Sequence, residues 1–554
     1  MTKESVSTTA VELSSSQGGF FSRLGKKIEL KGHDSDRRSN KDLDPIPPED
    51  RTWRGMDYVT YWISDNFSPS GWRKAASLMQ IGMSWRTALI NVAIGEIIIG
   101  VIVTINGYVG AKYRIPFSIQ SRAAFGYYFS YLMILMRCVV GIFWYGTSVY
   151  TGAECVRSMI YAIWPSFRNV KNSLPESANI DTQLMTCFFI YWLSVLPLHF
   201  IPMSKIRWMF NLKAITLPII GFGMMGWTIK NAGIGNNSLW TQGDTVHGSA
   251  FSWVFMQGLY SNIGGWATLA INSPDFTRYT TKVSNTYWMA IALPFTAVLV
   301  SFFGVVGAGG SQILYGSILW DPLLFVDNWT SKGGRAAAFF CALGFYVAQA
   351  AANVSANSIS AGNDLNCMFP KYINIRRGQI IVSLLGAWAF TPWNILTSAT
   401  TFLSFMSGYT IWLAPICGIM VSDFYFVHRR KYDVWELYKP DGIYRYNKYG
   451  INWRSFVAFF VGWVPLLPGF ITKVNSSIKV VDGMLHLYYS GYFYGFFSSM
   501  FIYWLLCFFF PATETMLETP VYCDDAPRDI EEMSESHDYI ESPDYDSVGE
   551  KKSN

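Results

Sequence analysis

Two pairs of side chains within apolar stretches have the types and the spacing that could bind a small molecule. Trp144 and Ser148 lie four residues apart in one stretch, and Asn353 and Asn357 have the same spacing in another. Residues four apart share one face of a helix, so each pair can face a single cavity. The indole offers a stacking surface, and the hydroxyl and amides offer hydrogen bonds. The alternative is that the asparagines bond neighbouring helices, which is worth about 0.6 kcal/mol on average.

The helices that must position these side chains include two that are interrupted. The apolar stretch 250–271 is long enough to cross a bilayer, but the adjacent Gly264 and Gly265 weaken a helix there. Such a break survives at membrane depth only where protein or a solvated cavity receives the freed backbone groups, so Trp266 should project into a cavity. A second interruption lies at 68–71, which reads Ser-Pro-Ser-Gly. Two broken spans at corresponding places in two halves indicate a transporter's substrate site, although small residues also form packing seams.

The composition is that of a membrane protein with many spans. Of the 554 residues, 51% are hydrophobic, 17% aromatic and only 15% charged, and the aromatic excess suits interface belts and stacking surfaces. The eight cysteines show no metal or disulfide spacing, and the six histidines do not cluster. No nucleophile–base, hydrolase or kinase motif is visible. We therefore expect no enzyme activity, no cofactor, no metal site and no nucleic-acid partner.

About twelve membrane helices are expected, with cytosolic tails at 1–56 and 512–554. The predicted spans are 57–84, 88–109, 127–162, 183–202, 208–229, 250–271, 287–308, 336–358, 379–397, 401–425, 455–472 and 491–511. With the N-terminus inside, the loops at 112–122, 205–207, 278–282, 371–377 and 428–431 are cytosolic and rich in Lys and Arg. The outer loops then hold the sequons at Asn236, Asn328 and Asn475.

Both tails are polar and are expected to be disordered. The first is rich in serine and charge, and the second is acidic and rich in Ser and Tyr. Lys551 and Lys552 are conceivable acceptors for ubiquitin and the endocytic machinery, although a merely solubilising tail is the simpler interpretation.

Several longer motifs resemble a known family. They are His247-Gly248-Ser249-Ala250-Phe251-Ser252-Trp253, the stretch 271–278 (INSPDFTR), the stretch 353–358 (NVSANS), the stretch 370–378 (PKYINIRRG) and the stretch 449–454 (YGINWR). On these residues the chain resembles nucleobase–cation symporter family 1, within it the fungal branch of uracil, uridine and allantoin permeases. The resemblance runs from about Asn40 to Phe510.

The resemblance implies an all-α fold and a substrate site. The fold is a five-plus-five inverted repeat, with helices 1 and 6 discontinuous and two further C-terminal helices, so the repeats are 57–229 and 230–425 and the last pair is 426–511. The family holds a planar ring between two tryptophans, which Trp144 and Trp266 match. Gly265 matches the glycine beside the second tryptophan, and Asn357 matches the asparagine that hydrogen-bonds the ligand. Ser148 stands where a glutamine is common, which removes an amide and leaves the substrate open.

The resemblance also bears on coupling. Bacterial relatives use two hydroxyl residues in a sodium site, where this chain has Ala351 and Ala352. A hard cation needs oxygen ligands, so a proton is the expected coupling ion. Asp65, just before the first break, is the predicted proton carrier, or else it caps or salt-bridges the first helix. Lys213 matches a lysine tied to substrate affinity in uracil permeases.

Further ionisable residues fall within the predicted spans. They are Glu96, Arg137 and Glu154, and because ionisable groups are costly there, each is a candidate for function. For Glu154, and for the neighbouring Arg157, snorkelling at the outer interface is the favoured interpretation.

The sequence therefore predicts a multi-pass plasma-membrane symporter that carries a small planar nucleobase-like heterocycle with a proton. A nucleoside or vitamin permease for uridine, thiamine or nicotinamide riboside is the alternative within transport. From a different class, a transporter-like nutrient sensor that binds but barely transports would also fit the motifs.

Overall fold

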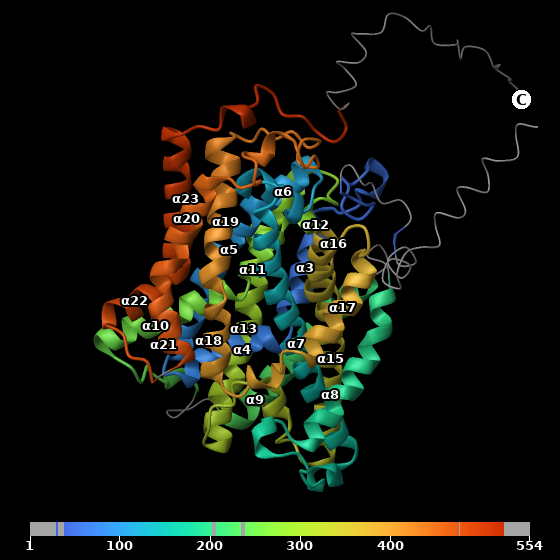
Figure 1. Cartoon of the computed structure of the whole chain (residues 1–554). Helices are drawn as coiled ribbons and strands as arrows, with labels where there is room; N and C mark the ends of the chain where they lie inside the picture. The colour runs from blue at the N-terminus through green and yellow to red at the C-terminus, as the bar shows by residue number, and fades with distance from the viewer. Residues whose placement is uncertain (1–28, 31–37, 202–206, 234–238, 476, 526–554) are drawn as a thin grey trace, which may run out of the picture.

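The computed structural model describes residues 29–30, 38–201, 207–233, 239–475 and 477–525, and their regular structure is helical (Figure 1). The first half contains α3 Gly55–Asn66, α4 Pro69–Gln80, α5 Trp85–Tyr113, α6 Phe117–Phe125, α7 Ser130–Ile163, α8 Thr182–Val195, η4 Leu196–Phe200 and α9 Arg207–Ala232. Among the described residues, extended pairing is limited to two isolated bridges, Trp53 with Thr280 and Asp433 with Val521.

The second half repeats this pattern of long and interrupted helices. It contains α10 Gly248–Gly264, α11 Ala267–Asn272, α12 Pro274–Thr277, η7 Val283–Trp288, α13 Met289–Tyr315, α14 Pro322–Val326, α15 Lys332–Ala352, the π-helix η8 Asn353–Ile359, α16 Ser360–Met368, α17 Ile375–Trp388, α18 Ala399–Gly408 and α19 Thr410–Ser422. The last helices are α20 Trp453–Trp463, α21 Leu467–Val474, α22 Asp482–Tyr489 and α23 Gly491–Phe509.

Nine helical segments of the described chain are long and apolar enough to cross a membrane. Three of the predicted spans fall short of that length. The first is split into α3 and α4 of 12 residues each, the sixth into α10 of 17 and α11 of 6, and α17 has only 14 residues. The all-helical membrane fold is thus as expected, while the number of about twelve spans stays a prediction.

The first break separates α3 from α4 at Phe67 and Ser68. The Ser68 side chain accepts a hydrogen bond from the Gly71 backbone N–H at 3.3 Å, and Pro69 stands at the first helical position, where no amide donor is needed. A Cβ at Gly71 would lie 2.0 Å from the carbonyl oxygen of Asn66. The Ser-Pro-Ser-Gly motif therefore both begins α4 and allows it to lie against the end of α3.

The second break separates α10 from α11 at Gly265 and Trp266. Trp266 leaves the helical conformation, with φ −113° and ψ 5°. A Cβ at Gly264 would lie 2.2 Å from the backbone oxygen of Met406, so this glycine allows α10 to pack closely on α18. The two broken helices occupy the expected positions in the two halves.

The predicted span 336–358 is instead one helical run from Lys332 to Met368, interrupted by the π-helix η8. The seven residues of η8 include both Asn353 and Asn357. The wider turn of a π-helix is frequent at functional sites.

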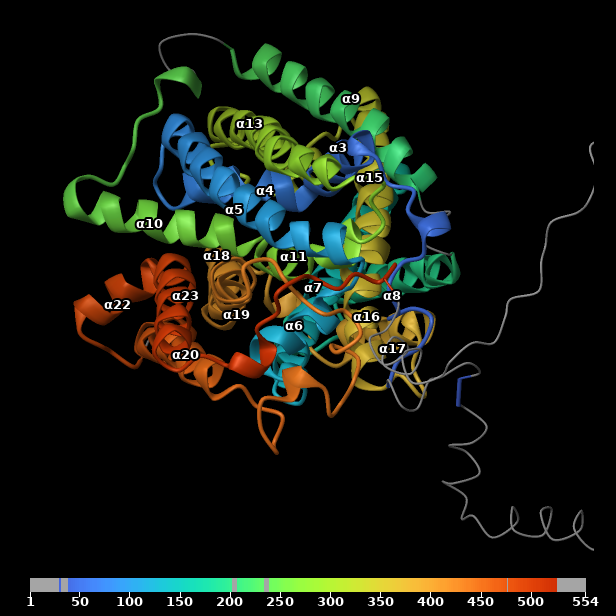
Figure 2. The same ribbon diagram turned by 90° about the horizontal axis from the view of Figure 1, so that it is seen from above.

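Figure 2 shows how these helices surround the breaks. Helices α7 and α11 and the α18–α19 pair lie near the middle of the bundle, with α9 at one side and α20 to α23 at the other. Helix α19 packs against α23, α13 against α5, and α15 against α7. The last helices thus pack on the outside of the bundle and not around the breaks.

Residues 38–54, which we call the N-terminal strap, correct part of the prediction of a disordered tail at 1–56. The Asn40 amide nitrogen donates to Asn366 at 2.6 Å and to the Pro370 backbone oxygen at 3.0 Å. The Tyr438 hydroxyl donates to the backbone oxygen of Leu43 at 2.7 Å. These bonds tie the strap to one end of the bundle, the tail-side end, formed by the strap and the loops 369–374 and 428–452 (Figure 1).

The first part of the C-terminal tail also packs at the tail-side end, which corrects the prediction of disorder for 512–525. The Val521 N–H donates to the Tyr432 oxygen at 2.9 Å, and Arg51 pairs with Asp524 at 2.7 Å. That arginine lowers the pKa of the Asp524 carboxyl. Residues 1–28, 31–37 and 526–554 of the two tails, Lys551 and Lys552 included, lie outside the described residues. So do the sequon at 236–238 and the middle residue of the sequon at 475–477.

Candidate functional site

A cavity of about 70 Å³ lies where the two broken helices meet α7 and η8, and we call it the central cavity. Its walls come from both breaks and from α18. The residues that line it are Asp65, Ser68, Ser70, Gly71, Lys74, Trp144, Gly265, Trp266, Thr268, Leu269, Ala356, Asn357, Phe402 and Met406. The cavity thus combines two indoles, an amide, a carboxylic acid and an amine.

Trp266 is held in place by a buried ion pair. The Lys74 ammonium lies 2.5 Å from a carboxylate oxygen of Glu96 and 4.4 Å from the centre of the Trp266 ring. The Trp266 indole N–H donates to the same Glu96 oxygen at 3.2 Å. Lys74 is 4% exposed and Glu96 fully buried, so charge pairing and a cation–π contact together orient this wall of the cavity.

Trp144 is held by a hydrogen-bond chain on the other side. Its indole N–H donates to the Tyr409 hydroxyl at 3.1 Å, and that hydroxyl donates to the backbone oxygen of Gly264 at 2.6 Å. Tyr409 lies at the kink between α18 and α19. The chain therefore couples the orientation of Trp144 to the end of α10.

The amide of Asn357 is oriented by the hydrogen bonds that its nitrogen donates. That nitrogen donates to the Ser148 hydroxyl at 3.0 Å, to Asn353 Oδ1 at 3.1 Å and to the Trp144 backbone oxygen at 3.3 Å. No donor from the described residues bonds the Asn357 carbonyl oxygen. This oxygen can therefore accept a hydrogen bond from a ligand, and Ser148 acts by fixing the amide.

Asp65 and Lys213 form a buried acid–base pair behind the first break. Asp65, on α3, is 6% exposed and Lys213, on α9, is fully buried. The charges of Asp65 and Lys213 act on each other, although no ion-pair contact joins the two side chains in the described structure. Asp65 lines the central cavity, so its charge state can respond to the cavity and to α9 together.

The predicted site residues thus divide into two groups. Trp144, Gly265, Trp266, Asn357 and Asp65 line the central cavity. Ser148 and Asn353 do not line it but bond to Asn357, and Lys213 is buried where its charge acts on Asp65.

Sequence reasoning missed Lys74 as a residue of the cavity. A signal was available, because Arg73 and Lys74 are charged residues within a predicted membrane span, where charges are rare and usually functional.

Glu154 does not snorkel at the membrane interface, as the sequence suggested. It is 6% exposed and pairs with Arg73 of α4 at 2.8 Å. Arg73 also bonds Asp321, the residue that caps α14, and donates to Thr151 at 2.8 Å. A buried arginine can satisfy two carboxylates at once, so α4, α7 and α14 are tied together at the end opposite the strap.

Arg137, another ionisable residue singled out in a predicted span, ties two helices together. It pairs with Asp364 of α16 and bonds both the hydroxyl and the backbone oxygen of Ser360. It does not line the central cavity. Its contacts hold α7 against α16, the helix that continues from η8.

A helical membrane bundle whose two broken helices meet at an aromatic and amide cavity is typical of a membrane transporter. The family model described as permease for cytosine/purines, uracil, thiamine, allantoin matches residues 45–495. The chain belongs to this family, the nucleobase–cation symporters.

Proteins similar to this chain include fungal permeases and the solved transporter Mhp1. A Schizosaccharomyces pombe permease is 44% identical, over 91% of this chain and 89% of its own. The uracil permease of Saccharomyces cerevisiae is 35% identical, over 85% and 76%. The structure of Mhp1 closed around bromovinylhydantoin matches with a TM-score of 0.67 at 20% identity, over 85% of this chain and 97% of that one.

Proposed function

We propose that this transporter takes up a small planar nitrogen heterocycle, a uracil-like or allantoin-like ring, across the plasma membrane together with a proton. The observation that carries the proposal is the central cavity, where Trp144, Trp266 and the free carbonyl oxygen of Asn357 converge. The family description and the similarity to a uracil permease support this class of substrate.

The ring is held by stacking and by hydrogen bonds. Each aromatic contact contributes about 0.5–1.5 kcal/mol beyond burial. The Asn357 oxygen accepts a ring N–H, and the Lys74 ammonium can donate to a ring carbonyl. Because a buried partner left unpaired costs about 1–3 kcal/mol, these two groups discriminate between ring edges.

The proton is carried by Asp65, with Lys213 as its electrostatic partner. Ala351 and Ala352 support this assignment, because their methyl groups offer no oxygen to a sodium ion. A potential of about 150 mV would supply roughly 3.5 kcal/mol for one proton, since each 100 mV gives about 2.3 kcal/mol. That energy supports roughly 300-fold accumulation, at ~1.4 kcal/mol for each tenfold.

Alternating access then moves two repeats, 57–229 and 230–425, around the central cavity, with 426–511 outside them. The tail-side end faces the cytosol in this proposal, as the basic loops predict. The Arg73, Glu154 and Asp321 cluster closes the opposite, outer end, and its ion pairs must separate when the cavity opens outward.

An uptake panel tests the proposal. Labelled uracil, allantoin, uridine and thiamine are offered to a permease-null yeast that expresses the chain. We expect uptake of uracil or allantoin, dependence on the proton gradient and no effect of replacing sodium by choline. Uptake of uridine or thiamine alone would instead support a nucleoside or vitamin carrier. Counterflow in proteoliposomes separates a carrier from a sensor, because a sensor binds the ring without exchanging it.

A further inference from the structure

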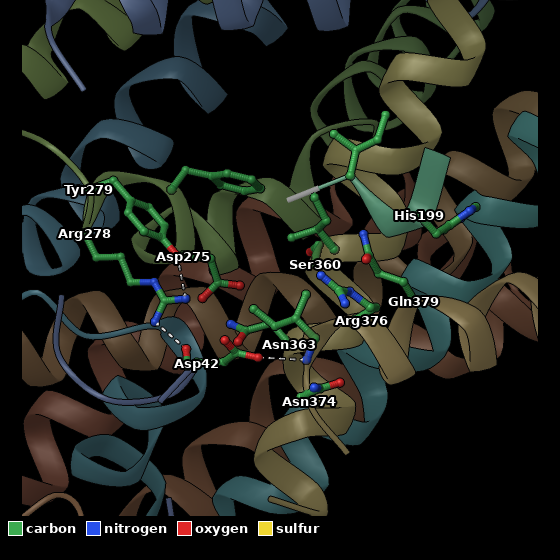
Figure 3. Close-up of a pocket in the computed structure, with 14 residues that line it drawn as sticks. Asp42, His199, Asp275, Arg278, Tyr279, Ser360, Asn363, Asn374, Arg376 and Gln379 are labelled. Atoms are coloured by element: carbon green, nitrogen blue, oxygen red, sulfur yellow. Dashed lines mark hydrogen bonds between the residues drawn. The ribbon is translucent and has the colours of Figure 1, made fainter. Parts of the chain in front are cut away.

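A second cavity lies at the tail-side end. Its polar side chains have no role in the central cavity. It has a volume of about 350 Å³. It is bordered by α12, α16, α17, η4 and the N-terminal strap (Figure 3). Its polar lining includes Asp275, Arg278, Asn363, Arg376, Gln379 and His199. We call it the tail-side cavity.

Asn363 is the most informative of these residues. It is 2% exposed, and both its amide nitrogen and its carbonyl oxygen lack a hydrogen-bond partner among the described residues. Buried polar side chains are almost always bonded, because an unpaired amide costs free energy. In Figure 3, Asn363 lies in the middle of the cavity's labelled residues. Its buried amide thus carries a donor and an acceptor side by side, neither of them bonded within the described residues.

His199 adds an acceptor on another wall. It is 1% exposed, its Nδ1 lies 3.1 Å from the Leu196 backbone oxygen, and its Nε2 has no partner in the described part of the chain. When Nδ1 of a neutral imidazole donates to a carbonyl, Nε2 keeps its lone pair and can accept. The cavity therefore offers two unpaired buried side chains, from η4 and α16.

The charged groups of the cavity favour a neutral ligand. Arg278 is already engaged, donating to the Asp42 backbone oxygen at 3.0 Å and to the Tyr279 hydroxyl at 3.2 Å. Two arginines, Arg278 and Arg376, and two carboxylates, Asp42 and Asp275, line the same space, so the charges of its lining balance. Phe276, only 5% exposed, supplies an apolar surface.

The two cavities are lined by successive parts of the same two segments of the chain. Asn357 of η8 lines the central cavity, and Asn363 of α16 lines the tail-side cavity. These residues are six apart on one helical run, which corresponds to about 9 Å along its axis. Leu269 of α11 lines the central cavity, and Phe276 of α12, seven residues later, lines the tail-side cavity. Asn363 therefore lies further along this helical run than Asn357, toward the tail-side end.

We propose that the tail-side cavity is a second binding site for the transported ring, occupied during its release. This inference rests on the proposed function. The Asn363 amide is complementary to a cyclic amide edge, because its oxygen accepts the ring N–H while its nitrogen donates to the adjacent ring carbonyl. His199 Nε2 accepts a further ring N–H. The site selects the same class of neutral planar heterocycle as the central cavity.

Equilibrium binding to the full chain in lipid nanodiscs tests this site, with labelled uracil and labelled allantoin as probes up to millimolar concentration. We expect two rings bound per chain at saturation. Trp144→Ala should weaken the central site and leave the second ring. Asn363→Leu should leave one ring, bound at the central cavity with unchanged affinity. His199→Phe, which keeps the ring volume but removes the acceptor, should weaken the second site at least fivefold.

Asn366→Leu is the matched control, because Asn366 lies on the same helix but is fully bonded to Asn40. It should lower thermal stability and keep both rings, whereas Asn363→Leu breaks no internal hydrogen bond and should fold as well as the wild type. One ring per wild-type chain, lost in Trp144→Ala, would overturn the inference and mean that the tail-side cavity holds only water. The proposed function would stand in that case. It falls instead if the wild-type chain neither binds nor transports either ring.

Discussion

The Lys74–Glu96 pair allows a strong test of how the central cavity is built. In the structure the Glu96 carboxylate has two partners, the Lys74 ammonium and the Trp266 N–H. In Lys74→Met it keeps only the Trp266 N–H, at 3.2 Å. Breaking a buried ion pair by removing one partner costs about 3–5 kcal/mol, because the remaining charge is uncompensated. We therefore expect Lys74→Met and Glu96→Gln each to lower the thermal stability and the surface abundance of the protein strongly.

The double variant Lys74→Met with Glu96→Gln separates stability from binding. Replacing both members of a buried pair is often nearly neutral, so this protein should recover most of the lost stability. It should still bind the ring about 5- to 160-fold more weakly, which corresponds to about 1–3 kcal/mol for a ring carbonyl left without its donor. Thermal stability is measured by fluorescence-detected size-exclusion chromatography, and affinity is measured by uptake competition.

Two results would refute this reasoning. Wild-type stability in Lys74→Met would mean that the pair does not stabilise the fold. Full affinity in the double variant would mean that Lys74 only positions Trp266 and does not touch the ring. Lys282→Met is the control, because this lysine is exposed and lies outside the central cavity, and it should change neither measurement.

Three further predictions concern the other walls of the central cavity. Trp144→Ala should weaken apparent affinity by at least about 2- to 13-fold, the equivalent of one aromatic contact of 0.5–1.5 kcal/mol. Trp144→Phe should have a milder effect. Affinity is measured by uptake competition, and unchanged affinity in the alanine variant would exclude stacking. Asn357→Ala should abolish or severely weaken uptake, whereas Asn353→Ala should lower surface abundance more than affinity, and the reverse pattern would exchange their roles. Uptake by the wild type should fall as external pH rises and collapse with a protonophore, and Asp65→Asn should lose accumulation but keep exchange; a wild-type pH profile in that variant would place the proton elsewhere.

Properties that depend on neighbouring residues along the chain could be predicted from the sequence. Apolar length and composition indicated a helical membrane bundle, and the glycines and proline at 68–71 and 264–265 located both breaks, because they act on their own helix. The motifs identified the family and with it Trp144, Trp266 and Asn357. The span at 379–397 was placed less well, since α17 already ends at Trp388. Thr391 follows with a left-handed backbone conformation, and Pro392 comes next. Neither residue continues an α-helix.

The partners of the charged residues were decided only by the tertiary structure. Glu96 stood out as a buried acid in the sequence, but its pairing with Lys74 and Trp266 joins α4, α5 and the second break. Glu154 looked like an interface residue until packing placed Arg73 beside it. The N-terminal strap looked disordered because its composition is polar, yet Asn366, Pro370 and Tyr438, each more than 300 residues further along the chain, bond to it. Hydropathy records how costly each group is to bury, whereas the packing of distant helices determines which other group offsets that cost.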